Sequence, residues 1–197
     1  PRRPSVDGPA LVEQLRQRRH DAPAGRRERM PGGQRGTVDV EPGPVDVAER
    51  TVLGHFSAGS VNLKEVDSKR DGNIQPTDTL NNVMREPDAV AWLDDTRFVT
   101  ANEGDYKGGS RSFSIFNTDG SVAWDAGMDL EYRLARIGHM NDRRNDAKGN
   151  EPENVAYGRF GSTDYLFVAS ERSSVVAVYD MSQPTAPAYK QALPGAV

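Results

Sequence analysis

Acidic residues recur at two matching places in this sequence, at a spacing that could build a metal site. Glu86-Pro87-Asp88-Ala89-Val90 is followed by an apolar run that ends at Asn102-Glu103. Glu151-Pro152-Glu153-Asn154-Val155 begins 65 residues later and is followed by a similar run that ends at Ser170-Glu171. Carboxylates that converge repel one another unless a cation neutralises them. The repeat therefore indicates cation chemistry if the fold brings its acidic residues together.

The candidate ligands come from both copies and from the polar segment between them. We expect the metal to be held by Glu103, His139, Glu153 and Glu171, with Asp88, Asp105, Glu151 and Arg172 around them. Carboxylates alone suit Ca²⁺ or Mg²⁺, whereas an added imidazole favours Mn²⁺, Fe²⁺ or Zn²⁺. No side chain stands out as a nucleophile, and no motif for an organic cofactor is visible. A metal-bound water is therefore the expected attacking group in any catalysis.

Short strands must position these residues. Alternation of apolar and polar residues predicts four strands at 88–93, 96–101, 112–117 and 121–125, and four more at 153–158, 164–169, 174–180 and 187–193. Four consecutive antiparallel strands form one blade of a β-propeller. Within a blade, the start of the first strand and the end of the second lie at the same edge. This topology gathers the candidate ligands on one face, and the loop with His139 opens on the same edge.

Several of these residues also have simpler explanations. A proline after Glu86 and after Glu151 suits the start of a strand, so the Glu-Pro pairs can be turn chemistry. Glu171 is followed by Arg172 and could form a structural ion pair with it. The stretch 66–74 is a polar turn that only partly resembles a calcium-binding loop. An ion-pair network without a metal is thus the alternative to a metal site.

Composition divides the chain into two parts. Residues 1–50 contain no aromatic residue and are rich in Arg, Pro and Gly, which predicts an irregular segment with a short helix at 9–18. Residues 51–197 predict an all-β portion of a propeller, with a strand at 51–56, blades near 86–127 and 151–197, and a helical turn at 130–134. Propellers usually have about four to eight blades, so we expect the chain to be a fragment of a longer polypeptide.

Composition also excludes some classes of protein. The chain has no cysteine, so disulfides and thiol catalysis are excluded. No apolar run is long enough to span a bilayer, and no signal peptide is visible. The net charge is −4, and the arginines between positions 16 and 29 have no interleaved aromatic residues. We therefore expect these arginines to be solvated, and we expect no nucleic-acid partner.

Several of these stretches resemble the choice-of-anchor I propeller proteins, over roughly residues 60–190. The matching stretches are Glu86 to Ala91, Val99 to Asp105, Arg111 to Phe116, Asp146 to Glu153 and Ser170 to Arg172. The family is similar to phytase-like and alkaline-phosphatase-like propellers, which are exported and often metal-dependent. The resemblance implies a ring of six or seven blades with a metal site at one mouth. Asn154 stands where the family usually has glycine, and asparagine tolerates a left-handed backbone better than most residues.

Two functions follow from the resemblance and the acidic edge. The first is an exported, metal-dependent hydrolase of phosphoric esters, of the phosphatase, phosphodiesterase or phosphotriesterase type. The alternative is a non-catalytic extracellular binding or adhesion propeller with structural calcium. The expected partners are a small-molecule phosphoester or an extracellular ligand, together with the remainder of the same propeller. We expect a secreted, periplasmic or cell-surface location.

Overall fold

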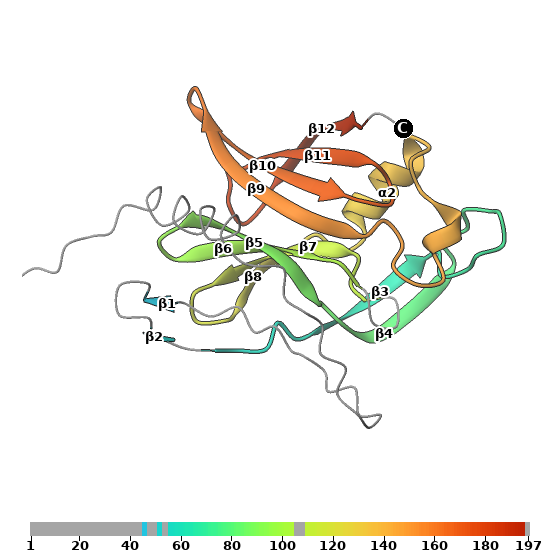
Figure 1. Cartoon of the computed structure of the whole chain (residues 1–197), viewed down its shortest axis with the longest axis horizontal. Coiled ribbons are helices and arrows are strands. Elements are labelled where there is room, and N and C mark those ends of the chain that lie inside the picture. Colours follow the sequence, from blue (N-terminus) through green and yellow to red (C-terminus); the bar gives the residue numbers. More distant parts are fainter. Residues whose placement is uncertain (1–44, 47–50, 53–54, 105–108, 196–197) are drawn as a thin grey trace, which may run out of the picture. The chain divides into compact units, whose positions relative to one another are not determined.

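β-Strands make up about half of the residues that the computed structural model describes, which are 45–46, 51–52, 55–104 and 109–195 (Figure 1). All of them fall within a unit that spans Val40–Val197. The helix expected at 9–18 and the candidate residue Asp105 lie outside the described residues, as does most of the segment 1–50. No helix in the described ranges is long and apolar enough to cross a membrane.

Two short ladders precede the main sheets. β1 (Val45–Asp46) pairs antiparallel with β2 (Thr51–Val52). Of the strand expected at 51–56, the described residues 51–52 form a strand and the described residues 55–56 do not. β3 (Ser60–Val66) pairs antiparallel with β4 (Asp78–Met84). The polar turn expected from residue 66 onwards is confirmed, because residues 67–77 form the irregular connection between β3 and β4. The alternation of apolar and polar residues did not reveal β3 and β4 themselves, since most of their side chains are exposed or half-buried.

The first large sheet contains β5 (Pro87–Asp94), β6 (Arg97–Asn102), β7 (Ser112–Asn117) and β8 (Val122–Asp125). Its strands are antiparallel and follow one another in sequence order. The turn between β7 and β8 places Gly120 at φ 87°, which is a conformation that glycine adopts at no steric cost. All four strands agree with the sequence prediction to within one or two residues.

A helical segment links the two large sheets. α2 (Asp129–Arg136) has acidic residues in its first turn and arginines in its last, which complements the helix dipole. Its buried residues Leu130 and Leu134 join the hydrophobic core. The helical turn expected at 130–134 is therefore confirmed and extends by one residue at its start and two at its end. The 3-10 helix η1 (Asp142–Arg144) follows, and residues 145–151 lead into the second sheet.

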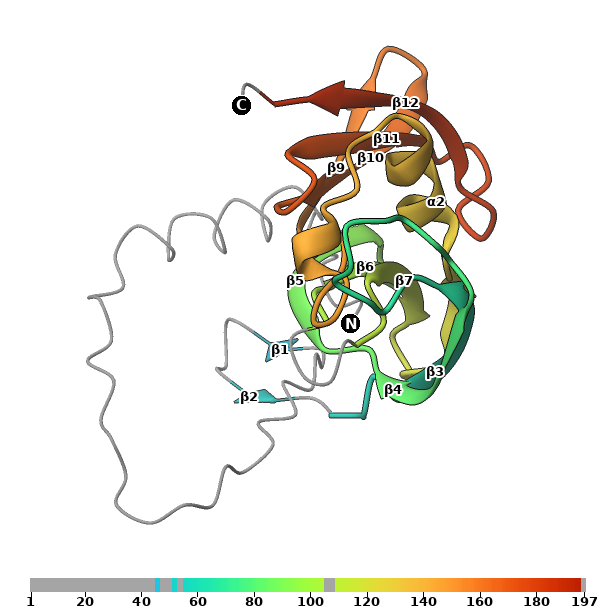
Figure 2. The same cartoon turned by 90° about the vertical axis from the view of Figure 1, so that its right-hand side faces the viewer.

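The second large sheet repeats the order of the first. It contains β9 (Pro152–Phe160), β10 (Thr163–Ser170), β11 (Val175–Asp180) and β12 (Ala188–Pro194), again antiparallel and in sequence order. The core lies between the two sheets and beside α2 (Figure 2). Val99, Phe113 and Ile115 from the first sheet and Leu166 and Val168 from the second are all fully buried in it.

The all-β class and the two four-stranded antiparallel sheets are confirmed. The propeller itself remains a prediction, because no sheet of the described residues closes on itself and a ring of blades is not seen among them. The important point for the site is that both sheets are meanders of the same connectivity. Matching positions in the two sheets can therefore be compared directly.

Candidate metal site at the edge of the two sheets

The first strand of each large sheet begins with the same backbone geometry. Glu86 and Glu151 both have a positive φ, of 44° and 52°. The carbonyl oxygen of Glu86 accepts a hydrogen bond from the amide of Glu103 at 3.1 Å, and that of Glu151 accepts one from the amide of Glu171 at 2.9 Å. Each Glu-Pro pair therefore sits beside the residue that ends the second strand, as strand polarity requires.

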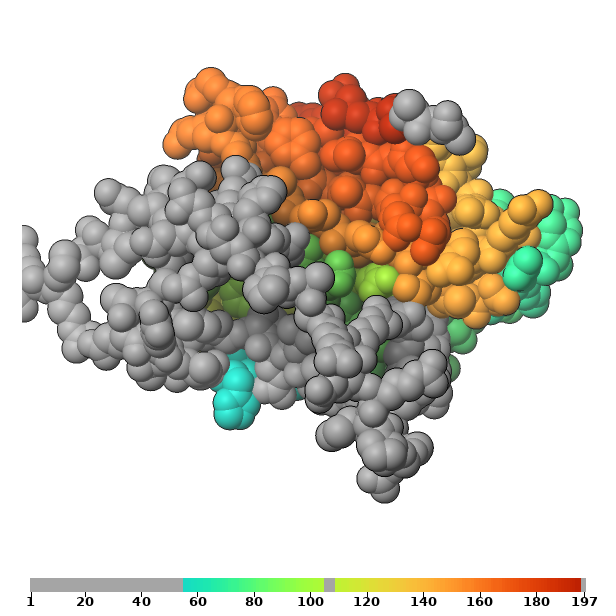
Figure 3. All heavy atoms as spheres, in the orientation of Figure 1, coloured from blue at the N-terminus to red at the C-terminus, as the bar shows by residue number. Residues whose placement is uncertain are grey.

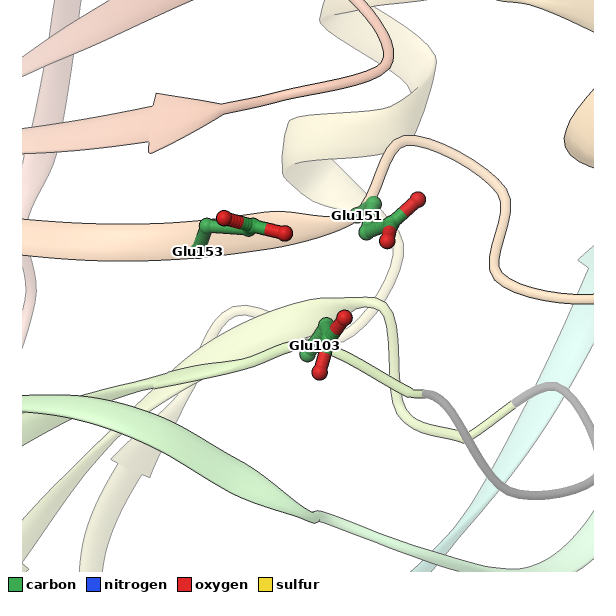
Figure 4. A group of neighbouring side chains, drawn as sticks. All are labelled: Glu103, Glu151 and Glu153. Carbon is green, nitrogen blue, oxygen red and sulfur yellow. The ribbon is translucent and has the colours of Figure 1, made fainter. Parts of the chain in front are cut away.

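Three carboxylates gather where these strand ends meet (Figure 4). Glu103 follows β6, Glu151 precedes β9 and Glu153 lies on β9. Each offers a carboxylate oxygen, and the three oxygens lie within 4.8 Å of one another. Glu151 is buried, while Glu103 and Glu153 are half-buried. Two of the four predicted ligands, Glu103 and Glu153, thus meet, together with Glu151 from the predicted surrounding shell.

Three basic side chains contact this carboxylate cluster. Lys148 Nζ forms an ion pair with Glu103 Oε1 and lies 2.7 Å from Glu151 Oε1. Arg172 Nε lies 2.6 Å from Glu151 Oε2, and the Arg144 guanidinium lies 3.3 Å from the same oxygen. Glu151 is therefore the carboxylate around which the basic side chains of the cluster converge.

The acidity of Glu103 and Glu151 differs because their surroundings differ. Burial raises the pKa of the Glu103 carboxyl, and its ion pair with Lys148 only partly offsets this effect. Burial acts in the same direction on Glu151, but hydrogen bonds from Lys148 and Arg172 outweigh it and lower the pKa of that carboxyl. Glu151 is therefore the carboxylate that stays ionised most readily.

Glu153 faces another carboxyl group, that of Glu171. The hydrogen bond between the two carboxyl groups, followed by burial and by the charges of Glu171, Glu103 and Asp88, raises the pKa of Glu153 to about 7. Glu171 itself pairs with Arg172 at 2.8 Å, so the ion pair considered from the sequence is present. With a pKa of about 7, the Glu153 carboxyl group titrates near neutral pH.

His139 lies in the loop after α2 and outside the three-carboxylate cluster. Its Nδ1 is 2.9 Å from the carbonyl oxygen of Ser173. If Nδ1 carries the proton and donates it to this carbonyl, Nε2 keeps the lone pair that a metal requires; metal-binding histidines are commonly oriented by such a hydrogen bond. Asp88 contributes through its charge, which raises the pKa of both Glu103 and Glu153.

Sequence reasoning named Arg172 but missed the other two basic partners of the cluster. Lys148 and Arg144 lie three and seven residues before Glu151, and residues 144–149 turn back on themselves through backbone hydrogen bonds to the Arg144 carbonyl. The one sequence signal for this contact is the spacing of Lys148 and Glu151, because a single turn can bring two residues that are three apart next to each other. The sequence of this stretch predicts only a polar connection. It does not predict which acidic residues Arg144 and Lys148 contact, because this depends on the path of the chain.

A second group of charged residues lies buried beside α2. The Arg111 side chain is 1% exposed and donates to the carbonyl oxygens of Asp67 at 3.0 Å and Asn145 at 2.6 Å. It also lies 3.5 Å from Glu131 Oε1. Burial raises the pKa of Glu131 to about 7, against the opposing effect of Arg111. This pair was not expected from the sequence, since neither residue belongs to the repeated phrase.

The turn at 67–77 is held by its own hydrogen bonds. Asp67 accepts from the backbone amides of Lys69 and Gln75, and from the side chain of Asn145 at 3.0 Å. Asp78 pairs with Lys69 at 3.4 Å. These contacts use the acidic oxygens that a calcium loop would need, and they support the interpretation as a turn.

The carboxylate cluster has the donor chemistry of a hard divalent cation. Oxygen ligands lie about 2.3–2.6 Å from Ca²⁺, so donors on opposite sides of one ion are separated by about 5 Å. The spacing of Glu103, Glu151 and Glu153 fits within this limit. Lys148 and Arg172 already neutralise part of the charge on Glu103, Glu151 and Glu171.

Comparison with known families supports part of this interpretation. The model of the choice-of-anchor I domain matches residues 106–184, which confirms the family resemblance over that part of the chain. The match includes the second acidic phrase and Glu171, while the first phrase and Glu103 lie before it. A choice-of-anchor domain indicates an extracellular, surface-associated protein. No curated protein and no solved structure is significantly similar to the chain.

Proposed function

Since residues 106–184 carry the choice-of-anchor I domain, we propose that this chain serves an extracellular, surface-associated protein that binds a divalent cation at the edge shared by its two large sheets. The observation that carries the proposal is the excess of carboxylates over basic groups among the described residues at that edge. Five acidic residues influence one another there: Asp88, Glu103, Glu151, Glu153 and Glu171.

The charge balance explains why a cation fits. Among the described residues, the basic groups that form ion pairs with these acids are Lys148, Arg144 and Arg172. With every group ionised, five carboxylates and three cations leave two negative charges among the named residues. A proton on Glu153 removes one of them near neutral pH. One divalent cation would remove both and would replace the proton that Glu153 holds.

The ligands that we propose are Glu153, Glu171 and Glu103, with His139 completing the set. Carboxylates alone favour Ca²⁺, whereas participation of the His139 ring would favour Mn²⁺, Fe²⁺ or Zn²⁺. In the simplest form of the proposal the ion is structural and joins the two sheets. Removing it with a chelator should then lower the melting temperature, because a ligand that binds only the folded state stabilises that state.

Calorimetric titration tests the cation site. The chain is freed of metal with a chelator and titrated at pH 8 with CaCl₂ and, separately, with MnCl₂. We expect saturable binding to the wild type, and binding weakened at least about tenfold by Glu153→Gln, since the loss of one charged ligand typically costs more than about 1.4 kcal/mol. Asp95→Asn, an exposed acid in the β5–β6 turn, is the matched control and should bind like the wild type.

The opposite result has a defined meaning. If neither cation binds and neither raises the melting temperature, the proposal is wrong and the edge is an ion-pair network. In that case Lys148→Met should destabilise the fold, because it would leave Glu103 and buried Glu151 without a shared partner.

A second candidate is hydrolysis of phosphoric esters at the same edge. The specific observation in its favour is the presence of basic side chains next to a carboxyl group that titrates near neutral pH. Arg172 and Lys148 could hold phosphate oxygens, and arginine matches a phosphate group in a bidentate manner. The pKa of Glu153, at about 7, suits a group that gives or accepts a proton at neutral pH. A bound divalent cation would supply polarisation of the phosphoryl oxygen.

Assays with p-nitrophenyl phosphate and bis(p-nitrophenyl) phosphate test the catalytic candidate. Turnover should disappear when metal is removed and return when it is added. Arg172→Met should lower kcat/KM at least about tenfold. Arg159→Met, an exposed arginine on β9, should leave kcat/KM unchanged. Turnover that survives complete removal of metal would contradict a metal-dependent reaction, and the absence of turnover of both esters would leave only the binding function.

The propeller is the architectural part of the proposal. Two meanders of equal connectivity, packed through one core, are what two neighbouring blades look like. The remainder of such a propeller is then a partner of these two sheets, together with a phosphoester or another extracellular ligand at the acidic edge.

A further inference from the structure

One basic side chain at the acidic edge already takes the place of a cation. Lys148 Nζ forms an ion pair with Glu103 Oε1 and lies 2.7 Å from Glu151 Oε1. Both acids belong to the group whose carboxylate oxygens lie within 4.8 Å of one another. Glu103 follows the second strand of the first sheet, and Glu151 precedes the second sheet (Figure 4). The ammonium group of Lys148 therefore bridges the two sheets among the carboxylates that would hold a metal.

The two oxygens of the Glu151 carboxylate have different basic partners. Arg172 Nε lies 2.6 Å from Oε2, and the Arg144 guanidinium lies 3.3 Å from the same atom. Lys148 contacts the other oxygen, Oε1. If the ammonium group withdraws, the two arginines still hold Glu151 through Oε2. Oε1 then becomes a ligand that a metal can use.

Lys148 can withdraw without a change in the fold. A lysine carries its charge on a flexible stem of four carbons, which moves by rotation about its own bonds. The backbone of residues 144–149 is fixed separately, because three amides of this turn donate to the Arg144 carbonyl. The Lys148 side chain is 16% exposed, and the gold segment around η1, just before it, lies at the surface in the space-filling view (Figure 3). The ammonium group can therefore reach water while the turn keeps its shape.

The following inference rests on the cation site proposed above. We propose that Lys148 is a built-in competitor for that site, whose ammonium group is displaced when a divalent cation binds. Two cations held by the same oxygens of Glu103 and Glu151 would repel each other, so they exclude each other. A divalent cation has twice the charge of the ammonium group and binds several oxygens at about 2.3–2.6 Å. Displacement adds Glu151 to the ligands Glu103 and Glu153.

The charge balance shows how this exchange sets the affinity of the site. With Lys148 in place, the five carboxylates named above and three basic groups leave two negative charges among the described residues. With Lys148 withdrawn, the five carboxylates face two guanidinium groups, and three negative charges attract the metal. The ion pairs of Lys148 must first be broken, so the lysine raises the cation concentration that fills the site. Weak binding suits an extracellular protein, since extracellular calcium modules have dissociation constants of about 10⁻⁴–10⁻³ M.

Calorimetric titration of the metal-free chain at pH 8 with CaCl₂ and, separately, with MnCl₂ tests the competition. Lys148→Met removes the ammonium group and keeps an unbranched side chain, so its dissociation constant for the cation should be at least about tenfold lower than that of the wild type. Lys148→Arg keeps the charge and should bind no more tightly than the wild type. Lys64→Met, at an exposed position on β3, controls for net charge and should bind like the wild type.

Acetylation of the wild-type chain follows the displacement directly and does not depend on the folding of a variant. An amine held between two carboxylates is shielded from acetic anhydride, whereas an amine in water reacts freely. Saturating CaCl₂ or MnCl₂ should therefore raise the acetylation rate of Lys148, measured by mass spectrometry of peptides, at least about threefold. The acetylation rate of exposed Lys64 should not change.

The outcomes separate this inference from the cation site itself. If the wild type binds a cation, but Lys148→Met with an unchanged circular dichroism spectrum binds it no more tightly, the competition is wrong and the cation site stands. Cation binding that leaves the acetylation rate of Lys148 unchanged has the same meaning. If Lys148→Met binds a cation and the wild type does not, the competition is right and the lysine itself is the resident cation. If neither chain binds a cation, both proposals are wrong.

Discussion

Glu131 and Glu153 both hold a proton near neutral pH, but for different physical reasons. Glu131 does so mainly because it is buried, although Arg111 lies 3.5 Å away. Glu153 does so mainly because it shares a hydrogen bond with another carboxyl group, Glu171. Burial is a property of the fold alone, whereas a carboxyl pair responds to any cation that approaches. The two residues should therefore respond differently to pH and to metal.

Glu131→Gln should reduce the pH dependence of stability. The pKa of Glu131 is raised from 4.5 to about 7 in the folded state, so the folded state binds the proton more tightly than the unfolded state. Its contribution is greatest below pH 4.5 and is lost as the pH rises through 7. The loss amounts to as much as about 3 kcal/mol, because each tenfold change in proton affinity corresponds to about 1.36 kcal/mol.

Urea unfolding at pH 5 and at pH 8 measures this effect. The free energy of unfolding of the wild type should be lower at pH 8 than at pH 5. In Glu131→Gln this difference in unfolding free energy should be smaller. Glu65→Gln, at an exposed position on β3, is the control and should keep the difference. If Glu131→Gln and the wild type show the same difference in unfolding free energy between pH 5 and pH 8, Glu131 is already ionised in the folded state at pH 5.

At the scale of elements, the strands of the large sheets and the helical turn at α2 were predictable, whereas β3, β4 and the path of the chain after η1 were not. All eight strands were predicted; β10 alternates between buried and half-buried residues, whereas β6 and β7 are buried on both faces. β3 and β4 carry few buried residues, so the pattern was too weak to find them. The carboxylates of the site could be predicted because strand polarity fixes which strand ends meet. Lys148 and Arg144 could not, since their position depends on the tight path of the chain after η1.

Gly149→Ala should destabilise the fold through the connection between η1 and β9. Gly149 has a φ of 58°, and a Cβ there would lie 2.8 Å from Arg111 Cδ and 2.9 Å from Glu131 Oε2. We expect a loss of about 2–4 kcal/mol, from backbone strain and from steric crowding of a buried ion pair.

Gly127→Ala separates these two causes. Gly127 has a similar φ of 54° but no neighbouring atom within 4 Å of an added Cβ. Its substitution should cost about 1 kcal/mol, from the backbone alone. Equal losses of unfolding free energy in the two variants would contradict the crowding of Arg111 and Glu131.

At the scale of the whole molecule, the proposed cation site links metal binding to pH and to the packing of the two sheets. A metal must displace the proton of Glu153, whose pKa is about 7, so its affinity should rise with pH across neutrality. CaCl₂ or MnCl₂ should therefore raise the melting temperature more at pH 8 than at pH 6. Scanning calorimetry of the wild type and of Glu153→Gln checks this, and an equal rise at both pH values would exclude Glu153 as a ligand.

The hydrogen bonds of the Arg111 side chain predict how the two loops that it contacts unfold locally. Its guanidinium holds the carbonyl oxygens of Asp67, before one long turn, and of Asn145, within the connection to β9. Asn145 in turn donates to the Asp67 carboxylate, and the Gly72 amide donates to Asp142. Neither loop can detach while the other keeps these contacts. Amide hydrogens in the two loops should therefore exchange with solvent as one cooperative unit, although more than sixty residues of sequence separate them.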